Sequence, residues 1–194
     1  MKLRLIPYLL TACVSTGLLA GAQSRYAGTT MDLTVKGTST LHDWSMKSLK
    51  ADCSGNFTIG ASGQIIGVEG LVFSTPATGL KSEHESMDNN AYKALKTDKN
   101  PTISYTVYSV TVSPAEAGGT VVTCKGKLTI AGASRDEEIV TLCRLNADNT
   151  ITVDGTERIS MKDYRIDPPS FMLGAVKTGD AVVLSFHLTL GKIN

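Results

Sequence analysis

The groups able to do chemistry are few and scattered along this sequence. The three histidines, His42, His84 and His187, lie in separate segments, and no HxH or HxxxH spacing links them. Zinc sites usually draw on such spacings, so we expect solvent-facing histidines and no metal site. The sequence also has no GxSxG, HExxH, Walker or CxxC motif. No motif therefore nominates a catalytic centre.

One carboxylate has an unusual position. Glu157 shares the alternating parity of Ile151 and Ile159, which would point it into the interior of a sheet protein. A β-bulge at Gly155 is the alternative, because it would return the side chain to solvent. Glu157 is the first residue to consider if the protein is an enzyme acting on a lipid.

Two cysteines have a spacing that suits a cross-strand pair. If the hairpin around residues 132–135 pairs Leu128 with Ile139, Cys124 lies directly opposite Cys143. This register predicts a disulfide between them in an oxidising compartment, with two reduced core thiols as the alternative. Cys53 would be left unpaired.

The elements that must position these groups are mostly strands. The segment at residues 182–190 alternates most clearly, with Val182, Leu184, Phe186, Leu188 and Leu190 on one face. About eight strands are expected, at residues 31–35, 51–59, 66–74, 103–112, 121–130, 137–145, 151–161 and 182–190. An even number of antiparallel strands closes readily, which predicts an all-β, up-and-down eight-stranded barrel.

A single helix is expected at residues 86–97, between the third and fourth strands. Met87, Ala91 and Leu95 share one face of it, with Tyr92 beside them. Ser86 or Asp88 would cap its start, and Asn100-Pro101 would end it. Such a helix can cover one end of a barrel.

The N-terminus predicts export. Lys2 and Arg4 precede an apolar run that ends in small residues, so residues 1–22 read as a signal peptide and the protein as periplasmic or secreted. A lipobox that makes Cys13 a lipidated terminus is the alternative. Residues 23–194 suit one domain. The net charge of +1 without a basic cluster makes nucleic acid and acidic membrane surfaces poor candidates for the main partner and favours a small molecule.

The interior of an eight-stranded barrel is either filled by side chains or open to one small ligand. Ala51, Gly55, Gly126 and Thr141 belong to the expected inward sets, and small residues there would leave room. Small residues also mark bulges and barrel corners, which is the alternative interpretation.

Four blocks carry a family resemblance: residues 38–44, 80–105, 126–140 and 161–180. They resemble, in order, the recurring blocks of the YceI-like family of secreted lipid-binding proteins. The resemblance implies a lipocalin-like barrel of eight antiparallel strands whose pore holds an isoprenoid lipid, such as a quinone tail or a polyprenyl chain, without a cofactor. The first block is similar to only one branch of the family, so the lipid is left open.

A pore of this kind would be lined by bulky apolar side chains at inward or lid positions. The candidates are Trp44, Phe73, Met87, Tyr92, Leu95, Ile103, Tyr105, Met161, Phe171, Met172, Leu184 and Phe186. Ordinary core packing is the alternative for each of them.

Three functions follow from the sequence. The first is non-catalytic binding, storage or transport of an isoprenoid lipid in the cell envelope. The second is a structural or interaction barrel with a filled core, and the third is an enzyme acting on a lipid. The sequence leaves open whether two barrels pair as a homodimer and which envelope partner delivers or receives the lipid.

Overall fold

The computed structural model describes residues 21–116 and 118–193, without the side chain of Met172. Most of the expected signal peptide, including Cys13, lies outside these residues. The strands are β1 (Ala22–Ser39), β2 (Trp44–Ser48), β3 (Asp52–Ile59), β4 (Ile65–Pro76), β5 (Thr102–Pro114), β6 (Thr120–Ile130), β7 (Ala133–Leu145), β8 (Ile151–Ser160), β9 (Ser170–Phe171) and β10 (Val176–Ile193). The helical elements are α1 (Glu85–Leu95) and the short 3-10 turns η1 (Ala77–Gly79), η2 (Lys162–Tyr164) and η3 (Met172–Gly174).

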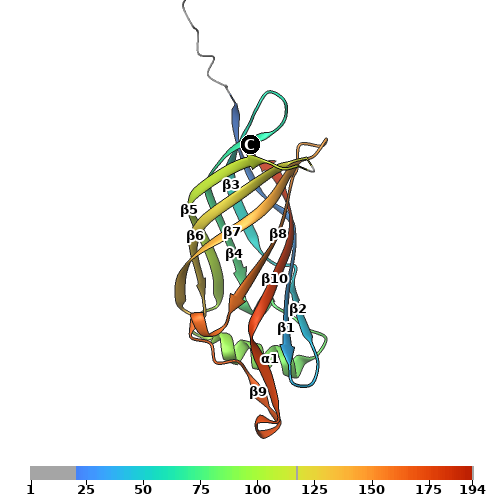
Figure 1. The fold of residues 1–194 in the computed structure, drawn as a ribbon, viewed down its shortest axis with the longest axis vertical. Coiled ribbons are helices and arrows are strands. Elements are labelled where there is room, and N and C mark those ends of the chain that lie inside the picture. Colours follow the sequence, from blue (N-terminus) through green and yellow to red (C-terminus); the bar gives the residue numbers. More distant parts are fainter. Residues whose placement is uncertain (1–20, 117, 194) are drawn as a thin grey trace, which may run out of the picture.

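Eight strands close into an antiparallel barrel (Figure 1). The order is β1-β3-β4-β5-β6-β7-β8-β10, and β10 pairs with β1 to complete the ring. This last ladder runs from Arg25 opposite Ile193 to Ser39 opposite Thr178. Closure gives every barrel strand two neighbours, so the sheet has no free outer edge.

The eight strands expected from the alternating pattern are confirmed as the eight barrel strands. The two additional strands, β2 and β9, have five and two residues, which is too short for a periodic pattern to identify. β2 pairs with the C-terminal half of β1, where Gly37 lies opposite Trp44 and Leu33 opposite Ser48. The N-terminal half of β1 pairs with β3.

The short helix is confirmed, and α1 lies across one end of the barrel (Figure 1). Its capping differs from the expectation. His84 is the N-cap residue and makes no side-chain capping bond, while Lys96 ends the helix in a left-handed conformation. Neither Ser86 nor Asp88 is the N-cap, because Asp88 lies one turn further in and accepts hydrogen bonds from the preceding segment.

The expected register of the β6–β7 hairpin is wrong. The strands join through a two-residue turn at Ala131 and Gly132, both with positive φ, so Ile130 lies opposite Ala133. A two-residue turn with positive φ at both positions suits a tight hairpin and moves the turn ahead of the expected residues 132–135. Cys124 therefore lies opposite Ile139, and Cys143 opposite Thr120.

The cysteines of this hairpin are consequently not a cross-strand pair. The four-residue offset separates them by roughly 13 Å along the strands, further than a disulfide spans. Cys124, Cys143 and Cys53 are free and buried. Burial raises the pKa of Cys53 and Cys124 to about 12 and that of Cys143 to about 11.

The small inward residues do not all leave space. Thr141 borders the central cavity, but the place where a side chain of Gly126 would lie is taken by the Tyr105 ring. A register shift in the β3–β4 ladder falls at Gly55, as in the alternative interpretation of a small residue at a bulge. Glycine at position 126 thus permits the close approach of an aromatic ring.

We predict that Gly126→Ala destabilises the protein by about 1–3 kcal/mol, the usual cost of overpacking. A Cβ at this position would lie 2.7 Å from the carbonyl oxygen of Thr106 and 2.8 Å from the Tyr105 ring. Urea unfolding measures the change. Gly67→Ala is the matched control in a strand, since its Cβ would meet Thr58 at an ordinary 3.5 Å. Equal midpoints for the two variants would contradict the prediction.

We also predict that stability falls at alkaline pH. The ordinary thiol pKa is 9.0, and burial raises that of Cys53 to about 12. Between these values the unfolded chain loses its proton while the folded one keeps it, so unfolding becomes easier as pH rises. Urea unfolding at pH 8 and pH 10.5 should show this loss, and Cys53→Ala should reduce it by roughly 1–2 kcal/mol. A stability of the wild type that does not change over this range would refute the assignment.

Candidate functional site

A cavity of about 470 Å³ occupies the axis of the barrel. Residues from all ten strands and from α1 border it. Along β10 the lining runs from Val176 to Leu190, a stretch of roughly 45 Å along a tilted strand. The cavity is therefore a long pore, which suits an extended ligand.

One end of the pore is closed by packed side chains. Ile151 and Leu190 are opposite each other in the β8–β10 ladder, and both are fully buried. Phe57, which borders the cavity, packs edge to face against the buried Tyr26, with ring centroids 5.5 Å apart. A ligand cannot pass this end without displacing tightly packed core residues.

The other end opens at α1. Four residues of the lining are exposed: Leu41, His42, His84 and Ser86. The first two lie in the turn between β1 and β2, and the others lie at the start of α1. We call this opening the mouth of the pore.

Buried polar contacts hold α1 across the mouth. The Asp88 carboxylate accepts hydrogen bonds from the backbone nitrogen and the hydroxyl of Ser82, both at 2.7 Å, and pairs with the Lys81 ammonium at 3.4 Å. Burial alone would raise the pKa of Asp88, but these hydrogen bonds and the lysine charge lower it. The carboxylate is thus anionic at neutral pH and anchors the first turn of the helix.

The helix directs an apolar face into the pore. Met87, Ala91 and Leu95 border the cavity as the helical spacing predicts. Tyr92 lies on the flank, and its hydroxyl donates to the carbonyl oxygens of Thr78 and Leu80, both at 2.9 Å. It therefore fixes the helix without bordering the pore.

The interior of the pore offers no free polar group. The Tyr105 hydroxyl donates to the carbonyl oxygens of Cys124 and Glu137, and the Thr141 hydroxyl to that of Val122. The Tyr164 hydroxyl donates to the Glu137 carboxylate at 2.7 Å. Among the described residues, no buried side-chain nitrogen or oxygen lacks a partner. A ligand in the interior must therefore be apolar along its length.

The titratable groups that line the interior are neutral at ordinary pH. Burial raises the pKa of Tyr105, and burial together with Glu137 raises that of Tyr164. The thiols of Cys53, Cys124 and Cys143 also border the pore, with the raised pKa values given above. In the described part of the chain no carboxylate does so.

Nearly all of the expected pore residues border the cavity. They are Trp44, Phe73, Met87, Leu95, Ile103, Tyr105, Met161, Phe171, Leu184 and Phe186. Tyr92 does not, and the side chain of Met172 lies outside the described part of the structure. Two aromatic rings reach their positions because a glycine lies opposite in the next strand: Gly37 under Trp44 and Gly155 under Phe186.

A smaller apolar cluster near the mouth was missed. Leu33, Met46 and Leu80 form it, from β1, β2 and the segment before α1. Met46 lies in the short strand that no periodic pattern revealed, and Leu80 lies outside any strand. The only available signal was the parity of Leu33 with Met31 and Val35 in the first strand.

Glu157 does not face the ligand space. The β8–β10 ladder is unbroken at Gly155, so the proposed bulge is absent and Glu157 lies opposite Leu184 with inward parity. Its side chain is nevertheless half-buried and does not border the cavity, and its carboxylate accepts a hydrogen bond from the Arg158 nitrogen. β7 pairs with β8 only up to Gly155, so the barrel wall is looser at Glu157.

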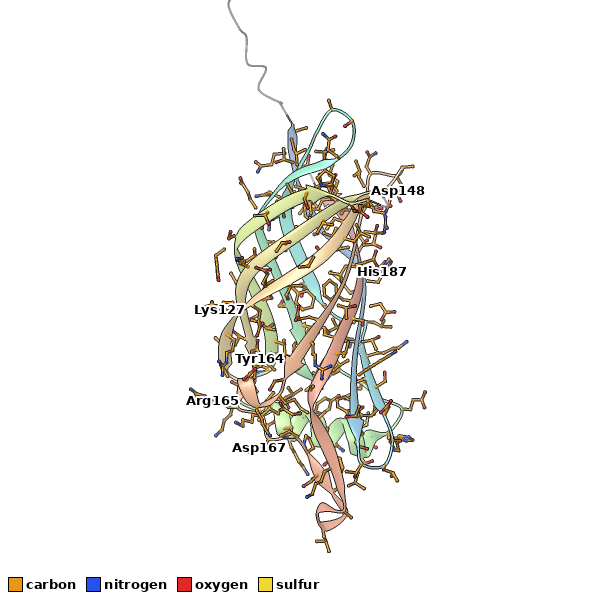
Figure 2. All side chains as sticks on the ribbon, viewed as in Figure 1. Lys127, Asp148, Tyr164, Arg165, Asp167 and His187 are labelled. Carbon is orange, nitrogen blue, oxygen red and sulfur yellow. The ribbon has the colours of Figure 1, made fainter. Side chains whose placement is uncertain are left out.

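His187 lies apart from the other two histidines. His187 lies on the outer wall, away from α1 (Figure 2), where its Nδ1 atom is 2.6 Å from the Asp154 carboxylate. His42 and His84 are at the mouth. Within residues 21–116 and 118–193, no group of three or more histidine, cysteine, aspartate or glutamate residues could hold a metal ion. No helix in these residues is long and apolar enough to span a membrane.

Solved structures share this architecture at low sequence identity. BcnA of Burkholderia cenocepacia matches with a TM-score of 0.65 and 15% identity over 82% of this chain and 95% of that one. A polyisoprenoid binding domain from Saccharophagus degradans, implicated in plant cell wall breakdown, matches with a TM-score of 0.57 and 14% identity over 90% and 100%. A Campylobacter jejuni YCEI protein matches with a TM-score of 0.52 and 16% identity over 66% and 75%. At these identities the matches show the fold.

The sequence itself matches a family model. A search of curated proteins finds no match, but the model of the YceI-like domain matches residues 44–190. This range begins at Trp44 in the mouth and ends at Leu190 at the closed end, so it covers most of the pore. The chain therefore belongs to the YceI-like family.

Proposed function

We propose that the protein binds an isoprenoid lipid, such as a quinone tail or a polyprenyl chain, in its pore. The observation that carries this proposal is a long cavity whose buried polar groups already have hydrogen-bond partners within the protein. Binding would come from apolar area removed from water along the whole chain. The Saccharophagus degradans relative, described as a polyisoprenoid binding domain, supports the same ligand class.

The two ends of the pore suggest the orientation of the ligand. The closed end is apolar, with Ile151, Leu190 and Phe57 buried there. The mouth carries the polar side chains of His42, His84 and Ser86. The lipid tail would enter first and point to the closed end, and a polar head group would stay at the mouth in contact with water.

Binding without catalysis suits the chemistry of the pore. Its tyrosines and thiols are protonated at neutral pH, and burial raises their pKa values further above it. Glu157, the residue first considered for an enzyme, does not border the cavity. A cavity of about 470 Å³ also disagrees with a barrel whose core is packed solid. Storage or transport of the lipid is thus the role that we propose.

We further propose that this role is carried out in the cell envelope, in the periplasm or after secretion. The supporting observation is the basic and apolar N-terminal sequence, with Lys2 and Arg4 before the apolar run. A carrier is most useful where an isoprenoid lipid must cross an aqueous space.

We predict that blocking the mouth weakens lipid binding at least about tenfold, or about 1.4 kcal/mol. Ala94→Phe places a ring into the pore from α1, because Ala94 borders the cavity. Trp44 is the single tryptophan and also borders the pore. A bound quinone should therefore quench its fluorescence, which allows titration with a prenylated quinone in mild detergent.

Lys93→Phe is the matched control for this titration, since Lys93 is the exposed neighbour on the same helix and does not border the cavity. It should bind like the wild type. A wild type that shows no saturable quenching, or an Ala94→Phe variant that binds as tightly as the control, would argue against a lipid in the pore.

A further inference from the structure

Two hairpin ends project beside the mouth (Figure 1). They are the turn between β1 and β2 (residues 40–43) and the β9–β10 hairpin (residues 170–177). The Thr40 nitrogen donates to the Lys177 carbonyl oxygen at 3.0 Å, and the Lys177 nitrogen donates to the Thr40 hydroxyl at 3.1 Å. These bonds join the two ends into one unit, which we call the mouth rim.

The mouth rim exposes leucines. Leu41 is 69% exposed, and Leu173 at the end of the β9–β10 hairpin is fully exposed. Leu173 also has a left-handed backbone, with φ 56°. Asparagine or glycine would suit this conformation better than a bulky residue. Neither solvation nor turn geometry therefore explains a leucine at this position.

The rim is also poor in charge. Residues 168–176 contain no charged side chain, although 19% of the residues in the whole chain are charged. Asp43 and Lys177 are the charges of residues 40–43 and 170–177. Bringing this surface into an apolar medium therefore requires little desolvation of charge.

We infer that the mouth rim docks on the surface of a phospholipid bilayer, with Leu41 and Leu173 inserted at the boundary of the acyl chains. This inference rests on the proposed function, because an isoprenoid lipid resides in a bilayer. Leu41 borders the cavity as well as facing outwards. Docking would thus place the open end of the pore against the membrane, and the lipid tail would enter without crossing water.

The composition of the mouth rim favours contact with acyl chains over contact with anionic head groups. The affinity of an interfacial contact scales with the apolar area that is buried, plus attraction between basic residues and anionic lipids. The rim offers exposed leucines and a single lysine. Its binding should therefore be measurable on neutral phosphatidylcholine vesicles.

The test is flotation of the full chain with phosphatidylcholine vesicles that contain no prenyl lipid. The Leu173→Asn variant removes the apolar side chain at the tip of the hairpin, and asparagine tolerates the left-handed backbone at this position. It should lower the partition coefficient about tenfold. Leu49→Asn is the matched control, because Leu49 is 72% exposed but follows β2 at the end away from the rim. The control should float like the wild type.

A second variant guards against misfolding. Leu173→Trp on a Trp44→Phe background should show blue-shifted emission when the vesicles are added, because the new indole enters the interface. A wild type that stays in the aqueous fraction, equal loss of flotation in Leu173→Asn and Leu49→Asn, or an emission that does not shift would overturn the inference.

Failure of docking can be distinguished from failure of the proposed function. Flotation uses vesicles without prenyl lipid, whereas quenching of Trp44 in detergent measures the pore without a bilayer. Leu173 does not border the cavity, so Leu173→Asn should bind prenylated quinone in detergent like the wild type. Quenching without flotation overturns docking alone, and flotation without quenching overturns the proposed ligand.

Discussion

The ladder between β1 and β10 turns a sheet of limited width into a closed barrel, and the pore depends on that closure. It joins the two ends of the described chain from Arg25 opposite Ile193 to Ser39 opposite Thr178. The alternation of β10 then points Val182, Leu184, Phe186, Leu188 and Leu190 into one enclosed space. Without the ladder, both edge strands would be unpaired and the same apolar row would face water.

A closed barrel still has to remain dry and open inside. The hydroxyls of Tyr105, Thr141 and Tyr164 satisfy this condition by bonding to protein acceptors. The rings of Trp44 and Phe186 lie over glycines of neighbouring strands, so they pack near the wall. The result is a long apolar volume whose closed end is packed and whose mouth is partly covered by α1. This difference between the two ends of the pore favours a chain-like ligand with one polar end.

Much of this architecture could be predicted from the sequence, because its signals are periodic and local. The alternation at residues 182–190 identified one wall of the pore, and Met87, Ala91 and Leu95 identified the inner face of the helix. Tyr92 lies on α1 across the mouth and does not border the cavity, because its hydroxyl reaches back to the carbonyl oxygens of Thr78 and Leu80, which helical position alone does not reveal. The ligand class came from family resemblance, since apolar patterns do not name a lipid.

The remaining errors concern geometry that no local pattern specifies. The β6–β7 register depends on a turn at Ala131 and Gly132, and alanine is an uncommon residue at positive φ. The offset of Cys124 from Cys143 follows from that turn. The cluster of Leu33, Met46 and Leu80 joins segments that meet only in the folded barrel. Strand register and contacts between distant segments depend on how the whole barrel closes, which no local pattern shows.

Native mass spectrometry of the purified protein shows whether the pore holds a lipid. We expect a species heavier than the polypeptide by the mass of one isoprenoid lipid, which is lost on extraction with organic solvent and restored when a prenyl lipid is added. The polypeptide mass alone, both in the purified protein and after incubation with prenyl lipids, would contradict a lipid-binding pore.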